Sequence, residues 1–459
     1  MLICCRALPT AAMDPGLPPE VRAALSRAQM PAGALSAVVQ DVDAGTALLS
    51  WQAQRPVNPA SLFKLATTYA ALDLLGPAYA WSTPVWLTGA LHDGVLEGNL
   101  VIKGQGDPKL VIERLWLLLR RVQQMGVREI RGDIVLDRSA FVIADGSPAE
   151  FDGEPLRPYN VRPDALLLSY KAVVYTFTPD AARGVARVGT EPALQGLQVD
   201  AHVPLLPGPC DDWRAALKAT PGDAERMRFA GGYPGSCGER SWPLAYADPA
   251  SYNARLLQAL WRELGGTLAG SVRDGPAPAT PPSFEVSSPA LAEVVRDINK
   301  YSNNPMAQQL FLTLGLVRRG SGTVDNARAV LRDWLQLQLG ERAEGLVVDN
   351  GSGLSRETRL SAEGLAQLLH SAWRSPVMPE LLASLPVAGV DGTARRSRGG
   401  VGRAHLKTGS LKDVAAVAGL VLGPGGRRRI VVGIINHPQA ELARPALDAL
   451  VQWAIKQSS

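Results

Sequence analysis

The stretch Asn58-Pro-Ala-Ser-Leu-Phe-Lys-Leu-Ala-Thr-Thr-Tyr-Ala-Ala-Leu-Asp-Leu-Leu-Gly76 decides how this sequence is interpreted. Its apolar residues recur at helical spacing from Leu62 onward, and Gly76-Pro77 ends the pattern, so a helix is predicted here. Two strand patterns, 34–42 and 46–51, precede it and are separated by a turn. The beginning of the chain is therefore expected to form a strand pair followed by a helix.

Ser61 and Lys64 stand where this helix begins. Residues three apart share a helix face, so the lysine amine can reach the serine hydroxyl. Serine is a weak nucleophile that needs a base, and lysine serves as one when burial and nearby positive charge lower its pKa. The helix N-terminus also favours negative charge developing at Ser61. Since Ser-x-x-Lys is a frequent chance match, a capping serine beside a surface lysine remains the alternative.

Lys407-Thr-Gly409 is a rarer triplet and carries more information. It lies in a predicted strand over 405–411, where a lysine and a hydroxyl are suited to binding a substrate carboxylate at a sheet edge. Gly409 would let an extended substrate lie close to the backbone. The alternative is an ordinary strand residue before a bend.

Ser302-Asn-Asn304 falls between two predicted helices, 289–300 and 306–316. Ser-x-Asn is also common by chance, and a second copy, Ser251-Tyr-Asn253, precedes another helix, where an N-cap role suffices. Ser302 is preferred because it lies between helices and follows the β-rich region of the chain.

The distribution of predicted elements indicates an α+β fold. Residues 84–283 contain short strands, turns and one amphipathic helix near 108–125, whereas helices and then strands follow. We expect an antiparallel sheet flanked by helices with a large β-rich insertion, because loop-closure entropy grows slowly with length. The expected organisation is an N-terminal segment (1–33), a first catalytic segment (34–83), an inserted domain of two subdomains (84–283) and a second catalytic segment (284–459).

Composition narrows the class of protein further. The 459 residues carry a formal net charge of only +4, which does not suggest nucleic-acid binding, and 46% are hydrophobic, as in chains that bury a core. The longest apolar runs fall short of the ~18 residues that a membrane helix needs. Gly104-x-Gly106 lacks the third glycine of a nucleotide loop, and no metal-ligand cluster is present. We therefore expect neither a cofactor nor a metal.

The cysteines suggest the compartment. Cys210 and Cys237 enclose a Gly-, Pro- and Asp-rich stretch, and a disulfide between them is favoured over two free thiols if the compartment is oxidising. Such a bridge contributes roughly 3–4 kcal/mol of stability. The first residues, Met1-Leu-Ile-Cys-Cys-Arg6, have too short an apolar stretch for a secretory signal. Either the start codon is wrongly placed or the signal is truncated.

Together the three triplets, in this order, resemble the active-serine penicillin-recognising enzymes. Further stretches resemble the class C low-molecular-mass penicillin-binding proteins, the D-alanyl-D-alanine carboxypeptidase/endopeptidase family. They are Gly104-Gln-Gly-Asp-Pro108, Asp349-Asn-Gly-Ser-Gly-Leu-Ser-Arg356, Leu385-Pro-Val-Ala-Gly-Val-Asp-Gly-Thr393 and Lys407-Thr-Gly-Ser-Leu411. The resemblance covers about 34–455 and implies a serine β-lactamase/DD-peptidase-like domain.

That resemblance implies a role for each residue. The catalytic residues would be Ser61 as the acylated nucleophile, Lys64 as its base and Ser302 as the proton donor to the leaving D-alanine. The substrate-binding residues would be Asn304, Lys407, Thr408 and Ser410. Asp152 is a candidate for binding the amine of diaminopimelate, and a turn aspartate beside Gly153 is its alternative.

The implied partners are peptidoglycan stem peptides, crosslinked ones included, and β-lactams, and the implied location is the periplasm. A catalytically weak peptidoglycan-binding or β-lactam-sensing protein of the same fold is the main alternative, although the complete residue set argues against it. A β-lactamase would lack the ~240 residues between Ser61 and Ser302. A Ser-His-Asp hydrolase is disfavoured because Gly351-Ser-Gly353 lacks the Gly-x-Ser-x-Gly spacing.

Overall fold

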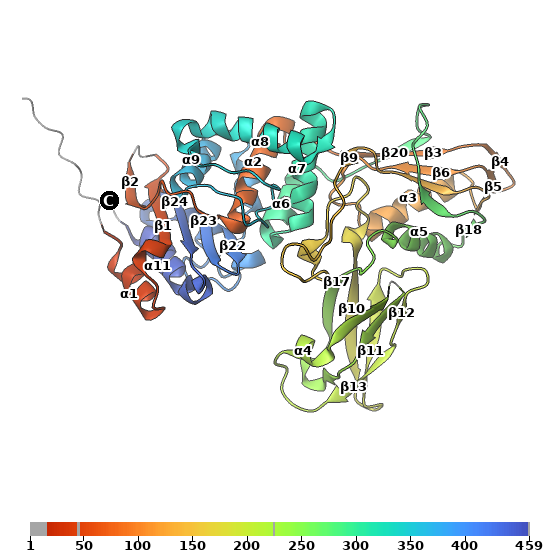
Figure 1. Ribbon diagram of the computed structural model, residues 1–459, viewed down its shortest axis with the longest axis horizontal. Coiled ribbons are helices and arrows are strands. Elements are labelled where there is room, and N and C mark those ends of the chain that lie inside the picture. The colour runs from red at the N-terminus through yellow and green to blue at the C-terminus, as the bar shows by residue number, and fades with distance from the viewer. Residues whose placement is uncertain (1–15, 44–45, 224, 458–459) are drawn as a thin grey trace, which may run out of the picture. The chain divides into compact units, whose positions relative to one another are not determined.

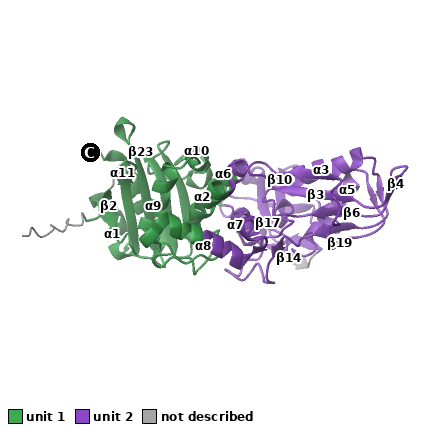
Figure 2. Ribbon diagram, turned by 90° about the horizontal axis from the view of Figure 1, so that it is seen from above, with its two compact units in different colours: residues 1–74, 295–302, 332–459 green, residues 75–294, 303–331 purple. Residues whose placement is uncertain are grey.

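The structure is a computed structural model that describes residues 16–43, 46–223 and 225–457. These residues form two compact units, which Figure 2 colours separately. The first unit combines the chain up to residue 74 with 295–302 and 332–459, and the second combines 75–294 with 303–331. Residues 1–15, which include the candidate signal, lie outside the described residues.

An antiparallel sheet is the centre of the first unit (Figure 1). Its strand order is β2-β1-β24-β23-β22, so β22 is an edge strand. The pairing of β1 with β24 runs from Leu35 opposite Ile435 to Asp41 opposite Arg429, which places early and late chain segments side by side. The strands are β1 (Leu35–Asp41), β2 (Ala47–Trp51), β22 (Ala404–Leu411), β23 (Val414–Leu422) and β24 (Arg428–Asn436).

Helices cover both faces of this sheet. On one face α1 and α11 pack over apolar side chains of β1, β23 and β24, and α9 packs on the opposite face. Strand β23 is buried along its length up to Val421, because a strand covered on both sides needs apolar residues throughout. The helices are α1 (Pro19–Arg27), α2 (Phe63–Leu75), α9 (Ala362–Trp373), α10 (Met378–Ser384) and α11 (Arg444–Lys456).

Helix α1 lies within residues 1–33, which were predicted to be a separate N-terminal segment. Its Val21 and Leu25 are buried in the core that α11 and the sheet share. This short helix has apolar residues at only three core positions, which is a weak periodic signal. Residues 19–27 thus belong to the first unit.

The second unit is rich in short strands, as expected for 84–283. One core of apolar side chains runs through it, with α3 (Ile112–Gln124) and α5 (Tyr252–Glu263) contributing leucines at helical spacing. One five-stranded sheet has the order β19-β8-β6-β3-β20, from β19 (Val272–Asp274), β8 (Ile134–Asp137), β6 (Leu100–Lys103), β3 (Ser82–Leu87) and β20 (Phe284–Ser287). Another has the order β16-β13-β11-β10-β17, from β16 (Tyr233–Pro234), β13 (His202–Leu206), β11 (Val185–Glu191), β10 (Ala172–Asp180) and β17 (Arg240–Ala245).

The smaller sheets of this unit complete the β-rich region. The short strands are β4 (Ala90–His92), β5 (Val95–Glu97), β7 (Glu129–Ile130), β9 (Phe141–Val142), β12 (Gln198–Val199), β14 (Ala219–Asp223), β15 (Arg226–Phe229), β18 (Thr267–Leu268) and β21 (Gly322–Thr323). Beside them a short helix, α4 (Trp213–Leu217), is capped by Asp212. Cys210 and Cys237 form a disulfide, with Cα atoms 4.8 Å apart, so the predicted bridge is confirmed.

The second unit extends beyond the 84–283 boundaries expected from the sequence. Helix α7 (Asn304–Arg319) belongs to it because Gln309 exchanges hydrogen bonds of 2.8 and 3.0 Å with the backbone of Asp164. The indole N–H of Trp81 likewise donates to Thr313 at 3.0 Å. Two helices, α6 (Leu291–Tyr301) and α8 (Val324–Leu339), pass from one unit to the other.

A mixed α+β fold with a β-rich insertion was predicted and is confirmed by this architecture. Among the residues that the structure describes, no helix combines the length and apolarity needed to cross a bilayer.

Candidate active site

Ser61 lies at the entry to α2, in a short 3-10 helix, η2 (Ala60–Leu62). Asn58 fixes the turn before it, since its side-chain oxygen accepts from the Ala60 N–H at 2.9 Å. Asn436, where β24 ends, accepts from the Asn58 N–H at 2.8 Å and donates to its carbonyl at 3.0 Å. The turn that carries Ser61 is therefore anchored to the central sheet.

Lys64 points at Ser61, as the i, i+3 spacing predicted. Its Nζ lies 3.1 Å from the Ser61 Oγ, and it donates to the backbone carbonyl of Ser352 at 2.6 Å. The lysine side chain is fully buried. Burial first, and then the nearby charge of Lys407, hold the pKa of Lys64 well below its ordinary value. A buried amine of this kind is suited to accepting a proton from the serine.

Lys407 and Ser302 form a second pair in the same unit. The Lys407 Nζ donates to the Ser302 Oγ at 2.9 Å and to the Thr408 carbonyl at 2.8 Å. Burial lowers the pKa of Lys407 to about 7. Ser302 follows α6 and has a positive φ of 55°, so the backbone turns sharply there. The Lys-Thr-Gly and Ser-x-Asn triplets thus meet at this hydrogen bond.

The edge strand β22 brings this pair next to the turn of Ser61. A Cβ on Gly409 would lie 2.9 Å from the Pro59 carbonyl oxygen, so a side chain there would push the strand away from the turn. Thr408 donates to Thr393 at 2.7 Å, and Ser410 accepts from Arg444 at 2.5 Å. Both hydroxyls therefore lie on the exposed edge with partners that fix their orientation.

Asn304 and Asp152 belong to the second unit, unlike the other predicted site residues. The Asn304 side-chain amide donates to the Tyr159 carbonyl at 3.2 Å. The Tyr159 hydroxyl donates to Asp152 at 2.9 Å, and Asn160 donates to the same carboxylate at 2.7 Å. Both partners lie in the 3-10 helix η3 (Pro158–Asn160), which thus connects the two predicted residues.

Asp152 is an exposed carboxylate with a defined direction. Burial raises the pKa of Asp152. The hydrogen bonds from Tyr159 and Asn160 lower it by more than burial raises it, so the net pKa lies below the ordinary value. The group is therefore ionised at neutral pH and suited to binding a cation. Its expected alternative, a turn aspartate, is also present, since Asp152 accepts from the Glu154 N–H at 3.0 Å.

Several site features were not predicted from the sequence. They include the Asn58–Asn436 clamp, the Ser352 carbonyl on Lys64, and Thr393 and Arg444 at the edge strand. The rejected Ser251-Tyr-Asn253 copy is structural: Asn253 is buried and donates to the Leu166 carbonyl at 2.9 Å. Ser251 holds the N-cap position of α5, but its hydroxyl accepts from Arg255 instead of capping the helix.

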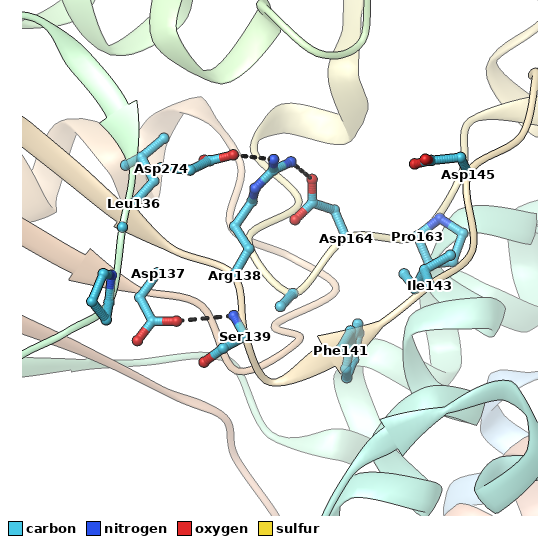
Figure 3. A pocket seen from close by; sticks show the side chains of 13 residues that line it. Leu136, Asp137, Arg138, Ser139, Phe141, Ile143, Asp145, Pro163, Asp164 and Asp274 are labelled. Carbon is cyan, nitrogen blue, oxygen red and sulfur yellow. Dashed lines mark hydrogen bonds and ion pairs between the residues drawn. The ribbon is translucent and has the colours of Figure 1, made fainter.

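The second unit has a polar cavity of about 480 Å³ (Figure 3). Arg138 lies between Asp164 and Asp274 and pairs with both, while Asp164 also accepts from Lys171 at 2.7 Å. Asp137 accepts from the Ser139 N–H at 2.9 Å. These charges are compensated within the wall of the cavity. Among the residues the structure describes, no cluster of histidine, cysteine or acidic side chains is arranged to hold a metal.

Comparison with known proteins identifies the family of this chain. A model of the D-Ala-D-Ala carboxypeptidase 3 (S13) family matches residues 21–457. A D-alanyl-D-alanine carboxypeptidase of Actinomadura sp. (strain R39) is 30% identical over 433 residues, covering 88% of this chain and 78% of the relative.

Solved structures show the same fold. Penicillin binding protein 4 from Haemophilus influenzae superposes with a TM-score of 0.77 at 23% identity, covering 95% of this chain and 99% of that one. A penicillin G-acylated predatory endopeptidase from Bdellovibrio bacteriovorus superposes with a TM-score of 0.52 at 15% identity, covering 92% and 91%.

The fold is thus that of the DD-peptidases with a β-rich insertion. The chain belongs to the D-Ala-D-Ala carboxypeptidase 3 (S13) family and is a peptidase of that family.

Proposed function

We propose that this protein is a serine-type DD-peptidase that cleaves the D-Ala-D-Ala bond of peptidoglycan stem peptides through an acyl-enzyme on Ser61. One observation carries the proposal: two buried lysines each contact a serine hydroxyl, at 3.1 Å for Lys64 and Ser61 and at 2.9 Å for Lys407 and Ser302. Burying two lysine amines in one site is costly for stability, and such arrangements concentrate at functional sites.

Acylation begins at Ser61. The neutral Lys64 amine accepts the hydroxyl proton while the Ser61 Oγ attacks the carbonyl carbon between the two D-alanines. Backbone N–H groups of Ser61 and Ser410 bind the oxyanion, each such donor contributing roughly 3–4 kcal/mol in enzymes that use this device. Strand β22 suits this role because it is an edge strand, so alternate N–H groups have no strand partner.

The leaving group departs with a proton from Ser302. The Lys407 ammonium donates to that hydroxyl at 2.9 Å, which makes Ser302 a better proton donor to the D-alanine nitrogen. The positive charge of Lys407, with Thr408 and Ser410, holds the terminal carboxylate, while Asn304 binds the penultimate amide. Ser302 regains its proton from the Lys64 ammonium. Water then attacks the ester carbonyl and gives a proton to the neutral Lys64 amine, which passes it to the Ser61 Oγ as the ester bond breaks.

The same acyl-enzyme serves an endopeptidase reaction when the leaving amine belongs to a D-Ala-diaminopimelate crosslink. It also accounts for acylation by β-lactams, because the four-membered ring presents its carbonyl to the same hydroxyl. We propose that the protein acts in the periplasm, where its polymeric substrate lies. The Cys210–Cys237 disulfide supports an oxidising compartment.

The direct test is to incubate the protein with a fluorescent penicillin, digest it and identify the modified peptide by mass spectrometry. Label on the peptide that contains Ser61, lost in Ser61→Ala, is the expected result. Label on another peptide would overturn the proposed role of Ser61, and no label would favour a silent peptidoglycan-binding protein of the same fold. Release of D-alanine from a pentapeptide, measured on the same preparation, tests the carboxypeptidase reaction itself.

A further inference from the structure

The loop over residues 350–354, here called the Ser352 loop, is closed by the side chain of Asn350. The Asn350 Oδ1 accepts from the Ser352 N–H at 3.1 Å and from its hydroxyl at 2.9 Å. The Asn350 amide donates to the Leu354 carbonyl at 2.7 Å, and the Leu354 N–H donates back to the Ser352 hydroxyl at 3.2 Å. One asparagine therefore fixes the peptide on both sides of Ser352.

This loop rests directly on the nucleophile and its base. The Thr67 hydroxyl, on α2, donates to the Gly351 carbonyl at 2.6 Å, and Lys64 donates to the Ser352 carbonyl at 2.6 Å. Gly353 has a φ of +74°, and a Cβ there would lie 2.0 Å from the Ala60 carbonyl oxygen. The loop thus packs against the backbone that immediately precedes Ser61.

The Ser352 carbonyl has two physical effects on the Lys64 amine. An N–H that donates to this carbonyl cannot point at Ser61, so the lone pair of the neutral amine can turn towards the serine hydroxyl. A carbonyl oxygen at 2.6 Å also stabilises the ammonium form. It therefore opposes burial and the charge of Lys407, both of which favour the neutral amine.

We propose that Asn350 is a positioning residue that aims the Ser352 carbonyl at Lys64 and thereby fixes the direction in which the base presents its lone pair. The proposal rests on the function proposed above, since it assigns no new reaction. The Asn350 side chain bonds to Ser352 and Leu354, so it acts through the loop it closes.

Charged groups also lie on the elements packed around Lys64. Lys407 lies on β22, and Lys300 on α6 pairs with Asp391 at 2.6 Å. Asp349 precedes the Ser352 loop, and Asp73 lies on α2, where it accepts from Trp334 at 2.8 Å. Substitutions at Asn350 leave all of these in place, so a changed pH profile reports on the loop.

The test measures the acylation rate by a fluorescent penicillin from pH 5 to 10 in the full chain. Asn350→Ala should slow acylation at least about tenfold. This is part of the rate enhancement of about 10²–10⁴ that a correctly positioned general base contributes. Its acid limb should move to lower pH, because the ammonium loses an acceptor. Asn350→Asp keeps the oxygen acceptor but adds negative charge, so its acid limb should move to higher pH.

A control variant and a second variant make the result unambiguous. Asn99→Ala removes a comparable side-chain bond, 2.7 Å to the Asp133 N–H, in the second unit, and should leave the pH profile unchanged. If Asn350→Ala does not fold, Thr67→Val removes the bond to Gly351 and should shift the acid limb in the same direction.

The outcomes separate the two proposals. If the wild-type protein is not labelled on Ser61, the proposed function fails. If it is labelled, but the Asn350 or Thr67 variants lose only thermal stability and keep the wild-type acid limb, the positioning role is overturned. Opposite shifts in Asn350→Ala and Asn350→Asp support it.

Discussion

At the scale of the residue, the two buried lysines have different surroundings, which supports the different roles proposed for them. Burial first, and then the charge of Lys407, favour the neutral form of Lys64, which contacts the proposed nucleophile Ser61. The pKa of Lys407 is lowered to about 7 by burial, and a bound substrate carboxylate would restore its charge. In many enzymes, two neighbouring titratable groups have surroundings that move their pKa values apart. One group then acts as the base and the other carries the charge that binds substrate.

The pH dependence of acylation follows from these pKa directions. The rate constant kcat/KM should rise as Lys64 loses its proton and fall as Lys407 does, with a basic limb near the Lys407 pKa of about 7. Stopped-time labelling with a fluorescent penicillin measures the profile. In Lys407→Arg, which keeps its charge to high pH, the basic limb should move upward. A basic limb at the same pH in this variant would exclude Lys407 as its origin.

The same lysine should cost stability. Its pKa is about 7 in the folded protein, whereas the unfolded chain has the ordinary lysine value, so the unfolded state binds more protons between those values. The free energy of unfolding therefore rises with pH across this window. Lys407→Met should reduce that rise to the part that the buried Lys64 contributes. It should also increase the free energy of unfolding at pH 6 by about 1–4 kcal/mol and abolish substrate binding. Denaturant melts of both proteins at pH 6 and 9 test the sign.

At the scale of the element, close approach of backbones assembles the site. Gly353→Ala would introduce a methyl group 2.0 Å from the Ala60 carbonyl oxygen at a φ of +74°. The loop or the Ser61 turn must move, so acylation should fall by two or more orders of magnitude. Gly76→Ala, at a similar φ of +82° in open space, is the matched control for backbone strain alone. Equal activity of the two variants would contradict this explanation.

A second element-scale prediction concerns the disulfide. Cys210→Ser with Cys237→Ser should lower the stability of the second unit by roughly 3–4 kcal/mol on the chain-entropy model. Hydrogen exchange of β10, β11 and β13 measures the local effect, and β1, β23 and β24 of the first unit serve as the internal reference. Unchanged protection of β10, β11 and β13 would show that their packing suffices without the bridge.

At the scale of the whole molecule, the predicted residues divide between the two units. Ser61, Lys64, Ser302 and Lys407 belong to the first unit, whereas Asn304 and Asp152 belong to the second. The bond-breaking steps are proposed for residues of the first unit, and the binding roles proposed for Asn304 and Asp152 are tested separately.

Asp152→Asn tests this division. The substitution removes the charge but keeps hydrogen-bonding atoms for Tyr159 and Asn160. For peptides with a free diaminopimelate amine, we expect KM to rise about tenfold or more, because a charge-assisted hydrogen bond is lost. The rate of acylation by penicillin should be unchanged. Peptides in which that amine is acetylated should not distinguish variant from wild type. Equal loss on both peptides would mean that Asp152 has only a structural role.

The sequence by itself determined the class of fold and the chemistry-bearing residues. Periodicity placed the helix after Ser61 and the late strands, and the order of three short triplets pointed to one reactive serine. These are local signals: strand and helix periods are set by neighbouring side chains, and i, i+3 spacing puts Lys64 beside Ser61 wherever the helix lies.

Only the tertiary structure decided what surrounds those residues. The Ser352 carbonyl that receives Lys64 lies 288 residues further along the chain, and the Asn436 that clamps Asn58 lies 378 residues away. Backbone carbonyls are common to every residue, so no sequence pattern marks the one that will meet the base. The division at α7 likewise depends on Gln309 meeting Asp164 across 145 residues. Residues far apart in the sequence become partners only when whole helices and strands pack together. The tertiary structure is therefore needed to identify these partners.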